Sequence, residues 1–203
     1  EKNMKKLLYV IMISLLSFTI YSCAKKSDSS SSSSTTTELE GTWLTSCFSS
    51  GSYYKIDTLT VSGTGMEYKS ERHSDSSCSS DNYTQEWTYS SLSIGDAVTF
   101  ESGTKTGAYF SMTVSGVTET QNNSYEVTWA NGGSGYCGYS DWELNVAKDF
   151  TGKTCGSTTF ASANTKLLGL YKNESSNTIR LGSFNIESDG YPSSVSTLDY
   201  TKQ

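Results

Sequence analysis

Residues 83–89 read YTQEWTY, and in this stretch large side chains alternate with Thr or Glu. The same alternation recurs in residues 66–71 (MEYKSE), 108–114 (AYFSMTV), 125–129 (YEVTW) and 142–146 (WELNV). Successive side chains of a β-strand point to opposite faces of its sheet, so a period of two indicates strands with one face on a core and the other in water. The body of the chain is therefore predicted to consist of strands.

Weaker strand patterns and turn signals complete this all-β prediction. The weaker strands are residues 43–47, 55–61, 97–101, 167–172, 178–183 and 197–201. Turn-forming residues stand at 62–65 (SGTG), 131–133 (NGG), 173–177 (NESSN) and 189–190 (DG). About ten or eleven strands at a spacing of roughly 8 to 15 residues, with no helix beyond a turn around residues 145–150, predict an antiparallel β-barrel or a β-sandwich.

The first predicted strand opens with Gly41-Thr42-Trp43, and Arg180 lies in the last part of the chain. This opening resembles the G-x-W motif of the lipocalin and wider calycin superfamily. In that family the tryptophan closes the bottom of an up-and-down barrel, and an arginine from the last strand packs over its indole. The resemblance implies a lipocalin-like barrel with Trp43 and Arg180 as the barrel-closing pair. The Gly-Thr-Trp opening, Cys47 and residues 197–202 (TLDYTK) also resemble a loose group of uncharacterised bacterial lipoproteins, which implies no activity.

A barrel of about eight strands can hold one small ligand in its interior. The alternating faces would then point a set of candidate ligand-lining side chains inward, namely Tyr68, Trp87, Tyr89, Phe110, Met112, Tyr125 and Trp129. An aromatic lining suits an apolar or amphipathic guest. The same pattern is equally compatible with a filled core that has no cavity.

The N-terminal part of the chain reads as an export signal, because Lys5 and Lys6 precede an apolar run at residues 7–20. The run is shorter than the roughly 20 apolar residues that a membrane-spanning helix needs. It leads into Ile20-Tyr21-Ser22-Cys23, which resembles the lipobox of bacterial lipoproteins. The resemblance implies a signal peptide over residues 1–22, cleavage after Ser22 and acylation of Cys23.

The predicted address is therefore the bacterial cell envelope, with attachment to the membrane through acyl chains. Ala24 follows the cysteine where an aspartate would signal retention in the inner membrane, which favours the outer membrane in a Gram-negative host. An ordinary secretory signal with an incidental cysteine is the alternative.

Residues 27–37 are almost entirely Ser and Thr, with nothing to bury in a core. We expect a flexible tether over residues 23–38 and a single folded domain over residues 39–203. Removal of residues 1–22 changes the formal net charge from −6 to −8, and only Arg72 and Arg180 are arginines. This acidic balance argues against a nucleic-acid partner.

Four cysteines remain beside Cys23, an even number in a chain predicted to be exported. Two disulfides are expected, and of the three connectivities Cys47–Cys78 with Cys137–Cys155 is favoured because each pair closes a local loop. A zinc site built from four thiolates is the alternative, but the short cysteine spacings of such sites are absent.

No catalytic site stands out in the sequence. His73 is the only histidine and lies beside Ser74 and Asp75 in a polar stretch that we predict to be an exposed loop. Adjacency in sequence does not provide the geometry of a catalytic triad. We therefore expect a protein that is not an enzyme, with no cofactor and no metal.

Two non-catalytic functions remain open at this point. The first is a carrier of a small apolar or amphipathic molecule in the barrel. The second is a surface interaction module of an adhesin-like, inhibitory or scaffolding kind, with a filled core and a protein or glycan partner, supported by Gly-rich loops such as residues 131–138.

Overall fold

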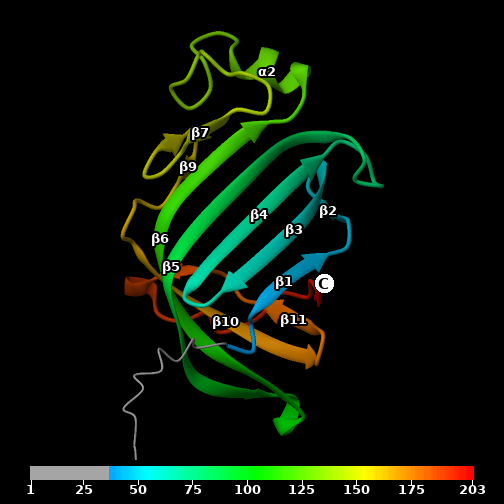
Figure 1. Cartoon of the computed structure of the whole chain (residues 1–203), viewed down its shortest axis with the longest axis vertical. Coiled ribbons are helices and arrows are strands. Elements are labelled where there is room, and N and C mark those ends of the chain that lie inside the picture. Colours follow the sequence, from blue (N-terminus) through cyan, green and yellow to red (C-terminus); the bar gives the residue numbers. More distant parts are fainter. Residues whose placement is uncertain (1–36) are drawn as a thin grey trace, which may run out of the picture. The chain divides into compact units, whose positions relative to one another are not determined.

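The computed structural model describes residues 37–203, and its main feature is a closed antiparallel barrel of eight strands (Figure 1). Each of these strands pairs with the next in the chain, and the last pairs with the first, so the barrel is of the up-and-down type. The predicted all-β barrel is confirmed, and its topology is consistent with the lipocalin-like type. The barrel strands are β1 (Gly41–Thr45), β3 (Tyr53–Ser62), β4 (Gly65–His73), β5 (Asp81–Phe100), β6 (Lys105–Gln121), β10 (Lys166–Ser175), β11 (Thr178–Leu181) and β13 (Tyr200–Lys202).

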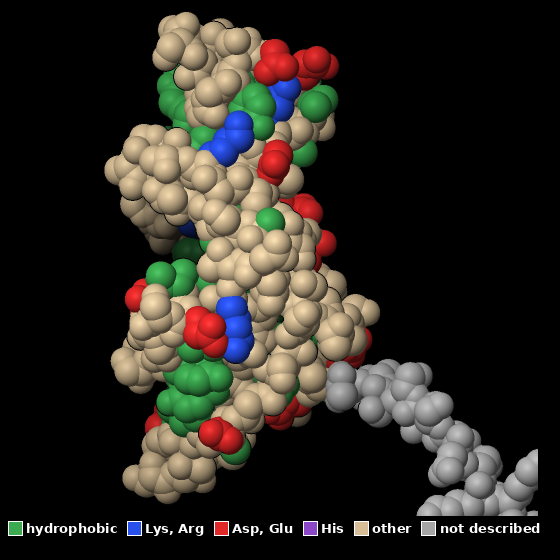
Figure 2. Space-filling view, turned by 90° about the vertical axis from the view of Figure 1, so that its left-hand side faces the viewer, with side chains coloured by type: hydrophobic (Ala, Val, Ile, Leu, Met, Phe, Trp, Pro, Cys, Tyr) green, Lys and Arg blue, Asp and Glu red, His purple; other side chains and the backbone are tan. Residues whose placement is uncertain are grey.

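Shorter elements flank the barrel. The strands β2 (Phe48–Ser50), β7 (Ala147–Asp149) and β12 (Asn185–Ile186) pair with β3, β6 and β10, respectively. A separate two-stranded sheet consists of β8 (Thr154–Cys155) and β9 (Thr158–Thr159). The part of the chain that the structure describes (coloured by side-chain type in Figure 2) also contains one α-helix, α2 (Ser124–Ala130), and two 3₁₀ turns, Glu101–Gly103 and Glu187–Asp189.

The strands differ greatly in length, and this divides the barrel into two ends. Residues 106–113 of β6 pair with β10, whereas residues 118–120 pair with the short β7. The sheet of β3 to β6 therefore extends past the ring that β10, β11, β13 and β1 close (Figure 1). We call the ring the closed end, and we call the extension, which includes residues 53–57 and 116–121, the open end.

The closed end is a packed core. Trp43, Leu59, Phe110 and Tyr171 are each at most 2% exposed. The indole Nε1 of Trp43 donates a hydrogen bond of 2.7 Å to the carbonyl of Leu39. Burial of aromatic and aliphatic side chains of this size is the main stabilising contribution in a small domain.

Of the predicted barrel-closing pair, Trp43 is placed as expected, but Arg180 is not. Trp43 lies in the core as expected, but the cation over its ring is Lys202, whose Nζ is 5.1 Å from the ring centroid. Arg180 contacts Asp199 at 2.6 Å and Glu174 at 3.2 Å instead. The reason is strand alternation, because the neighbours of Arg180 in β11 are buried and Arg180 itself points to the other face.

Two of the predicted strands are wrong. Residues 125–129 belong to the helix α2, because the side chain of Asn123 caps the helix by accepting a hydrogen bond of 2.9 Å from the backbone N–H of Glu126. Residues 142–146 lie outside the strands, where Asn131 exchanges two hydrogen bonds with the backbone of Trp142. The turn expected at residues 145–150 contains β7.

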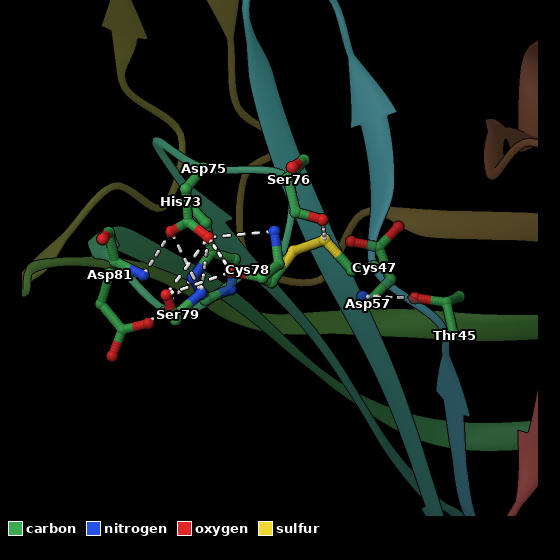
Figure 3. The surroundings of a disulfide bond; sticks show 11 residues. Thr45, Cys47, Asp57, His73, Asp75, Ser76, Cys78, Ser79 and Asp81 are labelled. Atoms are coloured by element: carbon green, nitrogen blue, oxygen red, sulfur yellow. Dashed lines mark hydrogen bonds and ion pairs between the residues drawn. A yellow bond between two sulfur atoms is a disulfide. The ribbon is translucent and has the colours of Figure 1, made fainter.

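Both predicted disulfides are confirmed. Cys47 and Cys78 join the start of β2 to the β4–β5 loop with a Cα–Cα distance of 5.9 Å, and Cys137 and Cys155 join the chain after α2 to β8 at 4.8 Å. The loop that carries Cys78 folds around Asp75, whose carboxylate accepts backbone hydrogen bonds from Ser77, Ser79 and Ser80 (Figure 3).

The predicted signal peptide and Cys23 lie outside the described residues. At the start of the described part, Leu39 is fully buried, and the carboxylate of Glu38 accepts a hydrogen bond from the hydroxyl of Tyr171. Within residues 37–203 no helix has the length and apolar character needed to cross a membrane.

Candidate functional site

Phe184, which follows β11, lies between the packed core of the barrel and a more open part of its interior. Its ring lies 5.9 Å from Tyr68, 6.1 Å from Tyr89 and 6.0 Å from Phe110, measured between ring centroids. Beyond Phe184, toward the closed end, Phe110 and Met112 are each 1% exposed. The side chain of Phe184 therefore separates a filled core from the more open part of the barrel.

On the other side of Phe184 lies a pocket of about 740 Å³, which we call the β3 pocket. Its polar side comes from β3 and β4, with Lys55, Asp57 and Tyr68. Its apolar residues are Phe48, which pairs with Lys55, and Leu181, Phe184 and Leu198, which alternate with Ser183, Ser196 and Thr197 along the lining. A lining of apolar residues with a few polar groups among them is the usual composition of a small-molecule site.

Asp57 is the most unusual residue of the β3 pocket. It is only 4% exposed, and its Oδ2 atom accepts hydrogen bonds from the hydroxyls of Tyr68 at 2.7 Å and Tyr200 at 3.5 Å. Its backbone N–H donates to Thr45 Oγ1 at 2.9 Å (Figure 3). Its Oδ1 atom is buried and has no hydrogen-bond partner among the described residues. A buried carboxylate oxygen without a donor is costly, so the pocket offers a strong acceptor.

The side chains around Asp57 have pKa values that differ from their ordinary values. Burial, reinforced by the neighbouring Tyr200 and by Asp57, raises the pKa of Tyr68. Burial and the Asp57 charge also raise the pKa of Tyr200. Both hydroxyls therefore stay protonated and donate to the carboxylate. Burial, followed by the positive charge of Arg72, lowers the pKa of Lys55, while Asp57 opposes this shift.

Two rows of inward polar side chains cross the open end from β3 to β6. The strand register places Asp57, Ser70, Gln85 and Glu119 in one row, and Lys55, Arg72, Tyr83 and Gln121 in the next. Glu119 is 1% exposed and accepts a hydrogen bond of 2.7 Å from Gln85. Burial raises the pKa of Glu119 to about 7, against the opposing effect of Gln85 and Gln121.

A second pocket of about 150 Å³ lies at the β6 end of these rows, and we call it the α2 pocket. Its rings are Tyr53, Tyr83, Tyr125, Trp129 and Tyr136, and its polar groups are Glu119, Gln121 and Glu126.

No protein-family model matches this chain, and no curated protein matches it in sequence. The barrel alone implies no function, because one fold hosts many. The function is therefore argued from the two pockets.

The predicted ligand-lining residues divide among three places. Tyr68 lines the β3 pocket, with Trp87 packed on it at 5.4 Å. Tyr89, Phe110 and Met112 belong to the buried core instead of a cavity wall. Tyr125 and Trp129 are 75% and 56% exposed and line the α2 pocket, because they stand on a helix and not on a barrel strand.

Sequence reasoning missed Asp57, Phe184 and Glu119 as site residues. Asp57 alternates with Leu59 and Val61, both buried, and this was the available signal that a carboxylate faces inward. Phe184 lies outside the strands, so no alternation identifies its direction.

The predicted exposure of His73 is wrong. It is the last residue of β4, only 3% exposed, and its Nδ1 lies 2.9 Å from Asp81 Oδ1. Strand β4 extends two residues beyond the predicted segment, so His73 ends a strand and is not part of an exposed loop. Within residues 37–203 no three His, Cys, Asp or Glu side chains form a metal-binding cluster.

Proposed function

We propose that this protein is a lipid-anchored, non-catalytic binding protein of the bacterial cell envelope that holds one small amphipathic molecule in the β3 pocket. Residues 1–23 support the anchoring, because they combine a charged start, an apolar run and a lipobox-like ending at Cys23. In a Gram-negative host the outer membrane is the proposed location, given Ala24 after the cysteine.

The observation that carries the ligand proposal is the unpartnered Oδ1 of Asp57 in a pocket that is also lined by apolar residues. A guest with a hydroxyl or amine at one end would donate to Oδ1 and remove the cost of the unpaired acceptor. Its apolar part would lie against Leu181, Phe184 and Leu198. The pocket volume of about 740 Å³ suits a small organic molecule.

A binding role is favoured over catalysis because of what surrounds the carboxylate. The two hydroxyls that face Asp57 come from Tyr68 and Tyr200, whose raised pKa values make them hydrogen-bond donors and poor nucleophiles. Lys55 lines the same pocket, and the charge of Asp57 opposes the lowering of its pKa.

The alternative function is a surface interaction module. Tyr125 and Trp129 favour it, because two large exposed aromatic side chains on one short helix are typical of contact surfaces.

The ligand proposal is tested by analysing the small molecules that the exported chain retains. The full chain is purified from the envelope in nanodiscs and extracted with organic solvent, and the extract is analysed by mass spectrometry. We expect a reproducible amphipathic molecule that is lost in Asp57→Asn and kept in the control Asp96→Asn, which changes an exposed aspartate. An empty wild-type pocket, or equal retention by both variants, would contradict the proposal.

The anchor is tested separately. Radiolabelled palmitate should enter the wild-type chain and not Cys23→Ser, and the wild-type chain should sediment with membranes. A labelled Cys23→Ser variant would exclude this residue as the acylated one.

A further inference from the structure

The α2 pocket is independent of the β3 pocket. The helix α2 follows β6 directly. It lies at the tip of the open end, away from the closed ring (Figure 1). Three strand spacings separate Asp57 on β3 from Glu119 on β6, which corresponds to about 14 Å across the sheet. The two pockets also share no lining residue, so each has its own set of contacts.

The floor of the α2 pocket presents hydrogen-bond acceptors. Glu119 and Gln121 point inward from β6, and each is 1% exposed. The Nε2 of Gln121 donates to Glu119 at 2.9 Å, whereas Gln121 Oε1 is buried and has no partner among the described residues. A guest that donates hydrogen bonds or carries a positive charge would satisfy this oxygen.

The walls of the α2 pocket are electron-rich aromatic rings, which pack against further aromatic rings outside the pocket. Trp129 packs against Tyr136 with 5.1 Å between ring centroids. Tyr136 in turn packs against Trp142 at 6.0 Å and Phe150 at 5.7 Å. Tyr125 and Trp129 are largely exposed, so their faces are open to a guest. Aromatic faces arranged in this way attract cations, and most strongly when Trp contributes.

Arg72 shows that this end of the barrel already accommodates a cation among rings. Its guanidinium lies 5.4 Å from the Tyr53 ring and 5.1 Å from the Tyr83 ring. The positive charge of Arg72 opposes the dominant effect of burial on Glu119, whose pKa is nevertheless raised. Glu126 on α2 adds a second carboxyl group to the lining of the pocket. The side of the pocket formed by Trp129 and Glu126 is therefore the side open to a positive guest.

We propose that the α2 pocket binds an organic ammonium group between Trp129, Tyr136 and Glu126. The guest's positive charge lies against the rings and the Glu126 carboxylate, and any N–H or polarised C–H groups point to Gln121 Oε1. The group is carried by a small soluble amine or by the headgroup of a lipid, since both present the same chemistry to the pocket.

Choline is the probe for this site, and the titration uses the full acylated chain in phosphatidylglycerol nanodiscs, which bring no ammonium headgroup. We expect saturable choline binding by calorimetry, together with a change in Trp fluorescence. Affinity should fall about tenfold in Trp129→Ala and about threefold in Glu126→Gln. The matched controls Tyr191→Ala and Glu143→Gln change an exposed ring and an exposed carboxylate elsewhere, and they should bind choline like the wild type.

An uncharged isostere separates charge from shape. The alcohol 3,3-dimethyl-1-butanol should bind far more weakly than choline, and equal binding would overturn the proposal. Binding of methyl glucoside in place of choline would also overturn it and assign the pocket to carbohydrate. Competition by phosphatidylcholine vesicles would identify a lipid headgroup as the source of the ammonium group, and competition by free amines alone would identify a soluble one.

The test also separates this proposal from the proposed function. Asp57→Asn should leave choline binding unchanged, because Asp57 lies at the other end of the polar rows. Loss of choline binding in Asp57→Asn with an intact fold would place the site in the β3 pocket and contradict the assignment to α2.

Discussion

At the closed end the inward positions of β6 carry Phe110, Met112 and Val114, each 1% exposed. Further along the same strand, at the open end, Val117 is followed by the inward residues Glu119 and Gln121. The two segments share one strand and one sheet, yet one fills a core and the other supplies polar groups to pockets. The difference follows strand length, because the short strands of the ring enclose only the first segment. The barrel is therefore filled by apolar side chains at one end and lined by polar side chains at the other.

The largest effect should come from removing a ring at the closed end. Phe110→Ala deletes a fully buried side chain and should lower the free energy of unfolding by about 4 kcal/mol. At the open end, Trp129→Ala removes a ring that is 56% exposed and should change it by less than about 1 kcal/mol. Urea denaturation followed by circular dichroism measures both. Similar losses in the two variants would remove the contrast between the ends.

The second effect is loss of the disulfide that ties the open end together. Cys47 and Cys78 are 31 residues apart, and the double variant Cys47→Ala with Cys78→Ala should lose roughly 3 to 4 kcal/mol on the chain-entropy model. Thermal unfolding under oxidising conditions tests this. If the double variant unfolded at the wild-type temperature, the open end would not depend on this link.

The third effect concerns the pH dependence of stability at the open end. Glu119 titrates near pH 7 in the fold and near pH 4.3 in an unfolded chain, so the folded state holds a proton that the unfolded state has lost between these values. The free energy of unfolding should therefore decrease as the pH rises through this window, by roughly 3 kcal/mol from this group.

Glu119→Gln should flatten that dependence and make the protein more stable than the wild type at pH 7.5. Denaturation at pH 4.5, 6 and 7.5 measures the change, and the two curves should converge at the lowest pH. A variant that keeps the wild-type slope would show that another group controls it.

The smallest effect should come from Ser70, in the same polar row as Asp57. Its hydroxyl is buried and has no partner among the described residues, and the residue is 3% exposed. Ser70→Ala should therefore stabilise the fold by about 1 kcal/mol. Thr58→Ala, on the outer face of β3, is the control and should not stabilise it. A destabilised Ser70→Ala would show that the hydroxyl has a partner, such as bound water.

Strand alternation correctly predicted an all-β barrel and the positions of three of its neighbouring strands, β4, β5 and β6. The predicted segments at residues 66–71, 83–89 and 108–114 all lie in barrel strands, and the local disulfide pairs followed from cysteine spacing. The helix α2 was mistaken for a strand because YEVTW alternates as a strand does, while the capping side chain of Asn123 precedes it. Local capping thus outweighed the period-two pattern.

The candidate site was only partly predictable, for a geometric reason. Inward residues of β6 have even numbers up to Val114 and odd numbers from Val117, because the pairing with β5 shifts between Val114 and Gly116. Such a bulge reverses the face of every later residue, so Glu119 could not be assigned to the interior from alternation alone. The grouping of polar side chains into rows depends on the register of four strands, which no single stretch of sequence specifies.

The pairing of β13 with β1 also sets the order in which this barrel can be completed. Thr45 pairs with Tyr200, and Trp43 pairs with Lys202, so the seam joins residues from opposite ends of the domain. A chain that emerges with β1 first must wait for β13 before the ring closes, and until then the side chains around Trp43 lack one of their neighbouring strands. Pairings of such high sequence separation form slowly and leave apolar surface exposed meanwhile. Closure of the ring is therefore expected to be a late step in the folding of this domain.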